Sequence, residues 1–261
     1  MNDKIRSFEE LTAEEQLAAG GKGGTLSRLY QAGYPVPDGF VILPTGFDQD
    51  QLRPEAWAQV QACLHRMRGN GPSRAFAVRS SAIAEDSAQA SFAGEFETVL
   101  SVRNDQDIRD AIHTVRRSRH SARVQAYSQA HGMHAAHDMA VVIQRLVSAD
   151  ISGVLFTADP ITGSQATMTG NFVLGSGDKL VSGEASGQTF IMRRPQSQYE
   201  GPPELRRFAR RLYKLARRLE KDLGGPLDIE WAIAKGKLYL LQSRPITTLQ
   251  GFNLATGKWN A

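Results

Sequence analysis

The chain has 261 residues, of which 41% are hydrophobic and 22% are charged, so it can bury a sizeable core as one large domain or two smaller ones. It has no apolar run near the ~20 residues that a membrane-spanning helix needs, and its first residues lack the apolar core of a secretory signal. Because Cys63 is the only cysteine, no internal disulfide can form, and we expect a cytoplasmic protein. Cys63 itself lies in an apolar helical pattern that is typical of a core residue rather than a nucleophile.

Over residues 8–47, a polar helix is expected to lead into a glycine-rich loop, Gly20 to Gly24, with Lys22 at its centre. Thr25 is positioned as the N-cap of a second helix, which ends near Gly33. Glycines let a backbone approach an anion closely and a helix N-terminus attracts one, so this loop is a candidate phosphate site. A flexible turn without a ligand would have the same pattern, and the Walker A spacing is absent.

A helix over about 54–68 and a strand over 75–79 follow, and Arg79 is the last residue of that strand. An arginine held by a rigid strand suits phosphate oxygens, because its planar fork can donate two hydrogen bonds. The small and polar residues from Ser80 to Gly94 predict a long loop, and loops of that length in compact domains are often functional. The alternative role for Arg79 is an ion pair with an acidic residue of this loop.

A basic helix over about 104–130 precedes the apolar segment 139–147, which predicts a central strand. Three histidines with metal-like spacing lie between these two elements, and their Ala-rich surroundings favour a solvated helix end over a metal site. They are His131, His134 and His137. Further short strands are expected at 153–157, 167–174, 180–183 and 189–193. Together these elements predict an α+β fold with mixed, largely antiparallel sheets.

The segment 193–203 has the composition of a linker, and a basic helix that includes Arg206 to Lys221 is expected after it. Apolar residues recur at helical spacing in this helix, so its many cations form the solvated face of an amphipathic helix. Since no aromatic residues are interleaved among the cations, an acidic partner surface fits them better than nucleic acid. The cations are Arg206, Arg207, Arg210, Arg211, Lys214, Arg217, Arg218 and Lys221.

The most informative pattern is a predicted β-hairpin near the C-terminus, where two runs of β-forming residues flank a Lys-Gly turn. With the turn centred on Gly236, Glu230 lies opposite Gln242, and Asp228 lies opposite Arg244. The four side chains then share one face, where carboxylate and amide oxygens beside a guanidinium suit Mg²⁺ with bound phosphate. A two-residue turn would shift this register and separate them, and an ordinary hairpin with surface ion pairs is the alternative.

Four segments of the chain resemble, in family order, the nucleotide-binding part of the phosphoenolpyruvate synthase and pyruvate phosphate dikinase family, which has an ATP-grasp fold. They are GGKGGTLSRLYQAGYPVPDGFVI, FAVRSSAIAEDSAQASFAGEFET, MAVVIQRLVSADISGVLFTADPITG and LDIEWAIAKGKLYLLQSRPITTL. They cover most of the chain, and the four together are far more specific than any one alone. The resemblance implies a compact ATP-grasp fold with an N-terminal subdomain over 1–135, a C-terminal subdomain over 136–249 and a tail over 250–261.

The resemblance also implies ATP and Mg²⁺ as ligands and a role for each matched residue. The implied phosphate-binding and catalytic residues are Lys22, Arg79 and Arg244. The residues expected around the rest of the nucleotide are Gly94 and Thr98 in a covering loop, Gln144 and Leu146 at the adenine edge, and Asp228. The implied Mg²⁺ ligands are Glu230 and Gln242.

The chain departs from the family pattern in two respects. Asp178 stands where the family has Glu, and none of the six histidines has the Thr-Ser-His-Ala-like setting of the family's phosphorylated histidine. The resemblance to split phenol- and cresol-phosphorylating synthases therefore implies a subunit that cleaves ATP to AMP and phosphate. It would pass a phosphoryl group to a histidine on a separate partner chain, for final transfer to a phenol, another alcohol or pyruvate. The alternatives are a non-catalytic nucleotide-binding regulatory module and a truncated domain of a larger phosphoenolpyruvate synthase or rifampin phosphotransferase-like enzyme.

Overall fold

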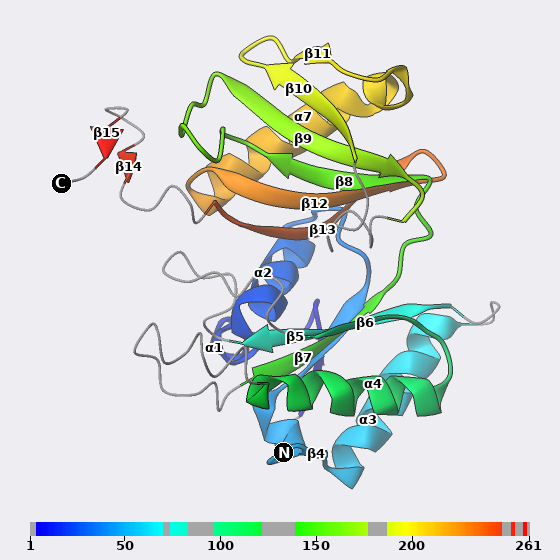
Figure 1. Ribbon diagram of the computed structural model, residues 1–261. Coiled ribbons are helices and arrows are strands. Elements are labelled where there is room, and N and C mark those ends of the chain that lie inside the picture. Colours follow the sequence, from blue (N-terminus) through cyan, green and yellow to red (C-terminus); the bar gives the residue numbers. More distant parts are fainter. Residues whose placement is uncertain are drawn as a thin grey trace. The chain divides into compact units, whose positions relative to one another are not determined.

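In the computed structural model, antiparallel sheets of five and six strands organise two compact units, residues 1–146 and 147–261 (Figure 1). The structure describes residues 4–69, 74–82, 97–121, 139–176, 187–246, 252–253 and 258–259. Every strand pairing among these residues is antiparallel, so the expected α+β class with largely antiparallel sheets is observed. Within the described part of the chain, no helix has the length and apolar character to cross a membrane.

The first unit contains the five-stranded sheet, in the order β1-β2-β7-β5-β6. Its strands are β1 (Ile5–Ser7), β2 (Gly39–Ile42), β7 (Met139–Arg145), β5 (Phe76–Ala82) and β6 (Thr98–Val102). Its helices are α1 (Ala13–Ala18), α2 (Gly20–Gln31), α3 (Pro54–Arg68) and α4 (Asp105–Arg117), with short turns η1 (Pro44–Gly46) and η2 (Ser118–His120). The two-residue strands β3 (Phe47–Asp48) and β4 (Gln51–Leu52) pair separately.

Alternation along the strands divides the side chains of this sheet between two faces. On one face, Val78 and Ile143 belong to a buried cluster that includes Ile112 of α4. On the other face lies α2, where a Cβ added at Gly23 would be 3.3 Å from Val142. With helices on both faces, β7 is buried along almost its whole length and central in the sheet, as its apolar segment predicts.

Strand β7 also sets the boundary between the two compact units. It pairs with β2 on one edge and β5 on the other, so it belongs to the first sheet. The compact units consequently divide after Leu146. The boundary at residue 135 that the resemblance implies is therefore too early, because it falls before this strand.

The second unit contains the six-stranded sheet, in the order β11-β10-β9-β8-β12-β13. Its elements are β8 (Ile151–Phe156), β9 (Thr167–Leu174), β10 (Gln188–Arg193), β11 (Gln198–Glu200), α7 (Pro203–Leu223), β12 (Leu227–Ala234) and β13 (Lys237–Pro245). Helix α7 lies along one face of the sheet (Figure 1). On β12, Trp231 is fully buried and its ring meets that of Phe190 edge-on, with centroids 6.2 Å apart. A further pair, β14 (Phe252–Asn253) and β15 (Lys258–Trp259), follows.

The expectation of a linker at 193–203 is wrong, because this segment forms β11 and its turn. Strand β11 pairs with β10, with Glu200 opposite Ile191. Arg194 donates a hydrogen bond of 2.6 Å to Glu220 of α7, and both side chains are largely buried. Proline and polar residues are typical of tight turns as well as of linkers, so composition alone did not separate the two.

Candidate functional site

The hairpin of β12 and β13 places the four predicted side chains opposite one another. Glu230 pairs with Gln242, and Asp228 pairs with Arg244, as the sequence predicts. The turn, however, is not centred on Gly236. Lys235 and Gly236 form a two-residue turn with φ of 48° and 74°, which matches a turn type common in hairpins.

A β-bulge restores the register that the two-residue turn alone would have lost. Trp231 pairs with Leu240 while Glu230 pairs with Gln242, so Leu241 is an extra residue on β13. Leu240 therefore shares the core face with Trp231, although its number has the same parity as that of Gln242. Beyond the bulge, Gln242 and Arg244 lie on the opposite face with Asp228 and Glu230.

The electrostatics of this cluster centre on Asp228, whose exposed fraction is only 8%. Arg244 donates to it from Nε at 2.9 Å and from Nη2 at 2.7 Å, and both bonds go to the same oxygen, Oδ2. The other oxygen, Oδ1, is buried without a hydrogen-bond partner among the described residues. Burial raises the pKa of Asp228, and the charge of Glu230 raises it further, against the lowering effect of Arg244.

These residues fit a magnesium ion with bound phosphate better than an all-protein metal site. The described part of the chain holds no group of three or more His, Cys, Asp or Glu residues that could enclose a metal. Magnesium, however, is often held by one or two carboxylates together with water and substrate phosphates. Glu230 and Gln242 are the residues that would supply the protein oxygens, and the unpaired Oδ1 of Asp228 is an acceptor that a nearby cation would satisfy.

The same face of the second sheet carries further polar residues that the sequence pattern does not predict. Val154 of β8 is opposite Glu230 on one side and Asn171 of β9 on the other, so the three share a face. Thr189 of β10 donates a hydrogen bond of 2.8 Å to Oδ1 of Asn171. No local signal marks these residues, because strand pairing alone brings them to the face of Asp228 and Glu230.

In the first unit, several of the predicted nucleotide-binding residues gather on the face of the sheet that α2 partly covers. Arg79 of β5 is directly opposite Thr98 of β6, and Gln144 of β7 is opposite Ala77, so these side chains share a face. Lys22 is only 5% exposed and its Nζ donates 3.3 Å to the carbonyl of Ser80, the residue after Arg79. The expectation that Arg79 ends its strand is wrong, because β5 continues through Ser80 and Ser81 to Ala82 and pairs with β7 along this stretch. Two cations therefore lie beside the middle of β5, an arrangement suited to an anionic ligand.

The prediction of a glycine-rich loop with Thr25 as N-cap is wrong, because α2 already begins at Gly20 and contains Thr25. The backbone N–H of Gly23 donates 2.8 Å to the hydroxyl of Ser81 and is not open to an anion. A Cβ at Gly24 would lie 2.3 Å from the carbonyl oxygen of Gln16 in α1. These glycines permit close packing of helices and strand rather than a phosphate-binding turn.

The structure describes the two residues predicted at the adenine edge, but not all of the other predicted residues. The side-chain Nε2 of Gln144 is buried and donates 3.4 Å to the carbonyl of Pro37. The backbone N–H of Leu146 donates 2.9 Å to the carbonyl of Ala75, and its adenine role stays a prediction. Gly94 and Asp178 lie outside the described residues, as do most of the covering loop and the three spaced histidines.

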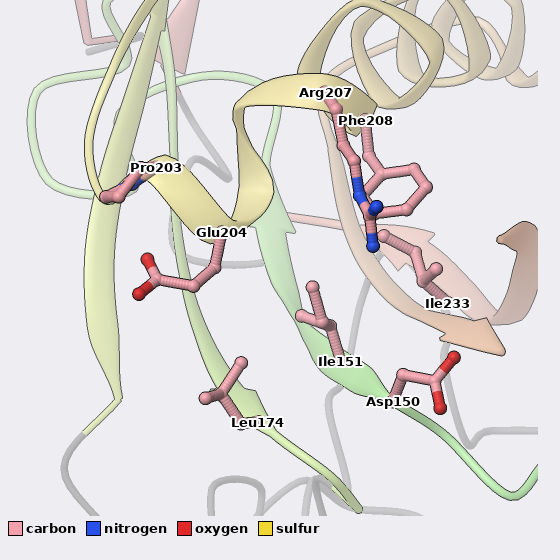
Figure 2. Close-up of a pocket in the computed structure, with 8 residues that line it drawn as sticks. All are labelled: Asp150, Ile151, Leu174, Pro203, Glu204, Arg207, Phe208 and Ile233. Carbon is pink, nitrogen blue, oxygen red and sulfur yellow. The ribbon is translucent and has the colours of Figure 1, made fainter. Parts of the chain in front are cut away.

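A cavity of about 450 Å³ lies elsewhere in the second unit, between the first turn of α7 and the ends of β8, β9 and β12 (Figure 2). It is lined by Asp150, Ile151, Leu174, Pro203, Glu204, Arg207, Phe208 and Ile233. None of these is a predicted site residue. Ile233 and Ile151 pair at one end of β12, whereas Asp228 pairs with Phe156 at the other, so the cavity is separate from the carboxylate cluster.

Comparison with known sequences shows which family the chain belongs to. Residues 45–208 and 205–255 match the family described as the pyruvate phosphate dikinase AMP/ATP-binding domain. The chain belongs to this family. The expected compact ATP-grasp form of the α+β class agrees with this membership and with the two-sheet architecture. As a dikinase-family ATP-binding domain, the chain has ATP as its expected ligand.

Full-length relatives of this ATP-binding domain include phosphotransferases. A probable phosphoenolpyruvate synthase of Methanothermobacter thermautotrophicus is 30% identical over 94% of this chain and 46% of the relative. The prodigiosin synthesizing transferase PigC of Serratia marcescens is 33% identical over 88% of this chain and 31% of its own length. A rifampicin phosphotransferase of Bacillus cereus is 29% identical over 95% of this chain and 36% of its own length. The chain thus spans less than half the length of these relatives.

Solved structures of amino-acid ligases are more distant. D-alanyl-alanine synthetase A from Vibrio cholerae matches with a TM-score of 0.47 and 12% identity, over 88% of this chain and 57% of that chain. An L-amino acid ligase from Bacillus licheniformis matches with a TM-score of 0.46 and 14% identity, over 87% of this chain and 42% of that chain. Likeness at this level supports no inference about ligands or reaction.

Proposed function

We propose that this chain is the ATP- and Mg²⁺-binding component of a dikinase-type phosphotransferase. It cleaves ATP to AMP and phosphate and passes a phosphoryl group to a histidine on a separate partner chain, for final transfer to a small acceptor such as a phenol, another alcohol or pyruvate. The observation that carries the proposal is the hairpin register, which sets Glu230 against Gln242 and Asp228 against Arg244 in a member of this family.

Each residue of the cluster has a distinct task in this mechanism. A Mg²⁺ ion, when bound, neutralises charge on the phosphates during transfer. Glu230 and Gln242 are the residues that would hold it. Arg244, oriented by its two hydrogen bonds to Asp228, directs a fixed guanidinium at phosphate oxygens. In the first unit, Lys22 and Arg79 supply two more cations for phosphate.

The proposed transfer balances as follows. The imidazole nitrogen of the partner histidine attacks the β-phosphorus of ATP, a P–N bond forms, and the bond to the α-phosphate oxygen breaks so that AMP leaves. Water hydrolyses the γ-phosphate to inorganic phosphate. Free imidazole can stand in for the histidine, so the test incubates the chain with Mg·ATP and imidazole and follows products by ³¹P NMR. We expect AMP, phosphate and phosphoimidazole, with Lys22→Ala at least tenfold slower.

The outcomes separate the candidate functions. AMP formation that depends on imidazole supports the phosphotransferase component. ADP as the only nucleotide product would contradict dikinase-type chemistry. Calorimetric binding of Mg·ATP without any turnover would instead support the non-catalytic regulatory module.

The raised pKa of Asp228 predicts a pH dependence of nucleotide binding. The carboxyl of Asp228 holds its proton more tightly in the folded protein than in the unfolded chain. Its contribution to the free energy of unfolding therefore falls as the pH rises from 3.8, the ordinary pKa, through the raised pKa of the folded state. A bound cation favours the carboxylate, so Mg·ATP binding is expected to release a proton from Asp228 within that window and to tighten as pH rises. Calorimetry in two buffers of different ionisation enthalpy measures this release. Unchanged proton release in Asp228→Asn would assign the effect to another group.

A further inference from the structure

Helix α7 carries a basic stripe, defined as its eight exposed cations between Arg206 and Lys221. At 100° per residue, all eight fall within an arc of about 140° on the helix surface, and no acidic residue lies inside that arc. From Arg206 to Lys221 the stripe spans 16 residues and is roughly 22 Å long. The buried residues of α7 occupy the opposite side; they are Leu205, Phe208, Ala209, Leu212, Tyr213, Ala216 and Leu219.

The charge of the stripe exceeds that of the whole protein. The chain has 31 basic and 27 acidic residues and a net charge of +4, whereas α7 alone has eight basic and three acidic residues. Like charges three and four positions apart destabilise a helix, and surfaces selected only for solubility mix the two signs. The concentration of one sign on a single face is therefore unfavourable for the isolated chain, and an anionic partner would relieve the repulsion.

Several of the arginines are held in place. The guanidinium of Arg206 lies over the ring of Tyr199 at 5.7 Å, and those of Arg207 and Arg211 lie over Phe208 at 4.6 and 5.2 Å. Figure 2 shows Arg207 beside Phe208 at the first turns of α7. Ordered guanidiniums lose less entropy on binding, so these contacts preorganise the surface.

The centre line of the stripe lacks countercharges. Arg217 and Arg218 pair with Glu220 and Asp222 of the same helix. Among the described residues, Arg210, Lys214 and Lys221 have no ion pair or hydrogen bond. These last three residues lie between the other cations around the helix and are open to a partner.

We infer that the basic stripe is a docking surface for an acidic protein surface, such as a helix that carries carboxylates at intervals of four residues. The apolar side of α7 is buried in its own unit, so the helix has no apolar face to insert into a membrane. Single-stranded nucleic acid would need open aromatic faces, but the rings of Phe208 and Tyr199 are covered by guanidiniums. A straight row of fixed cations matches the spacing of carboxylates on a facing helix.

The test uses a labelled 20-residue helical peptide of Glu and Ala, with Glu every fourth residue, and fluorescence anisotropy at several salt concentrations. The stripe variant is Arg210→Glu, Lys214→Glu and Lys221→Glu. The matched control is Arg103→Glu, Arg109→Glu and Arg117→Glu, which removes the same charge from exposed residues of the first unit. We expect salt-sensitive binding that weakens at least tenfold in the stripe variant and less than twofold in the control. If the stripe variant does not fold, the corresponding Gln variants replace it.

Three results would overturn the inference. They are no peptide binding, an equal loss in both variants, and tighter stripe-dependent binding of a 20-base-pair DNA or of phosphatidylserine vesicles at the same ionic strength. Mg·ATP binding measured in parallel should be unchanged in both variants, because the stripe lies on the side of α7 away from its sheet. Failure of the docking inference is thus distinguishable from failure of the proposed phosphotransfer.

Discussion

Replacing Glu230 with Gln is expected to lower metal-dependent phosphotransfer about 100-fold, because mutating residues that only orient a metal ligand already costs roughly 10- to 100-fold. The side chain keeps its size and one oxygen, but it loses the negative charge that a magnesium ion requires from at least one ligand. Stability should change little, because Glu230 is only half-buried and its strand pairing with Gln242 and Val154 is unaltered. Rates of AMP formation at varied Mg²⁺ concentration measure the loss.

Glu204→Gln is the matched control for this experiment. Glu204 is an exposed carboxylate of the same unit, in the first turn of α7, and it lines the separate cavity at the other end of the sheet (Figure 2). Its replacement should leave the rate and the Mg²⁺ dependence unchanged. Equal effects of both substitutions would show that general surface charge, rather than a ligand at Glu230, sets the rate. Full activity of Glu230→Gln at low Mg²⁺ would remove the metal-site assignment.

The hairpin illustrates how a sequence can predict cross-strand pairs correctly through an incorrect turn geometry. Alternation and the Lys-Gly turn were sufficient to pair Asp228 with Arg244. The actual turn has two residues and by itself would shift the strand register by one residue. The bulge at Leu241 that restores the register has no recognisable sequence signal. The bulge is favoured because it lets Leu240 join the buried Trp231 while Gln242 remains beside Glu230. That balance depends on the packing of the whole sheet and cannot be read from the strand alone.

The glycine-rich segment shows the opposite case, in which a familiar pattern had a different physical cause. Glycine is required both where a loop approaches a ligand and where two elements pack closely, and the sequence does not distinguish them. Lys22 nevertheless reaches β5 from the first turn of a helix, donating to the carbonyl of Ser80. The phosphate role of Lys22 stays a prediction, and its contact with β5 could not be read from the local pattern because Ser80 lies 58 positions away in the sequence.

Gly20→Ala is expected to destabilise the protein by roughly 3 kcal/mol or more, because two penalties combine. Gly20 has a φ of 76°, which residues with a Cβ rarely adopt. In addition, the new Cβ would lie 2.2 Å from the carbonyl oxygen of Ser81, so α2 or β5 must move. Because this contact supports Lys22 over Ser80, Mg·ATP affinity should fall together with stability. Urea denaturation and calorimetry measure the two effects.

Gly33→Ala separates the two penalties. Gly33 has the same φ of 76°, but a Cβ there would meet nothing within 4 Å, so only the backbone penalty of about 1 kcal/mol applies. The difference between the two variants therefore reports the close approach of α2 to β5. Similar losses in both would mean that β5 yields easily at Ser81 and that Gly20 is retained for its backbone conformation alone. A large loss of stability confined to Gly20→Ala, together with weaker nucleotide binding, would show that close packing of α2 against β5 positions Lys22 on the predicted phosphate-binding face.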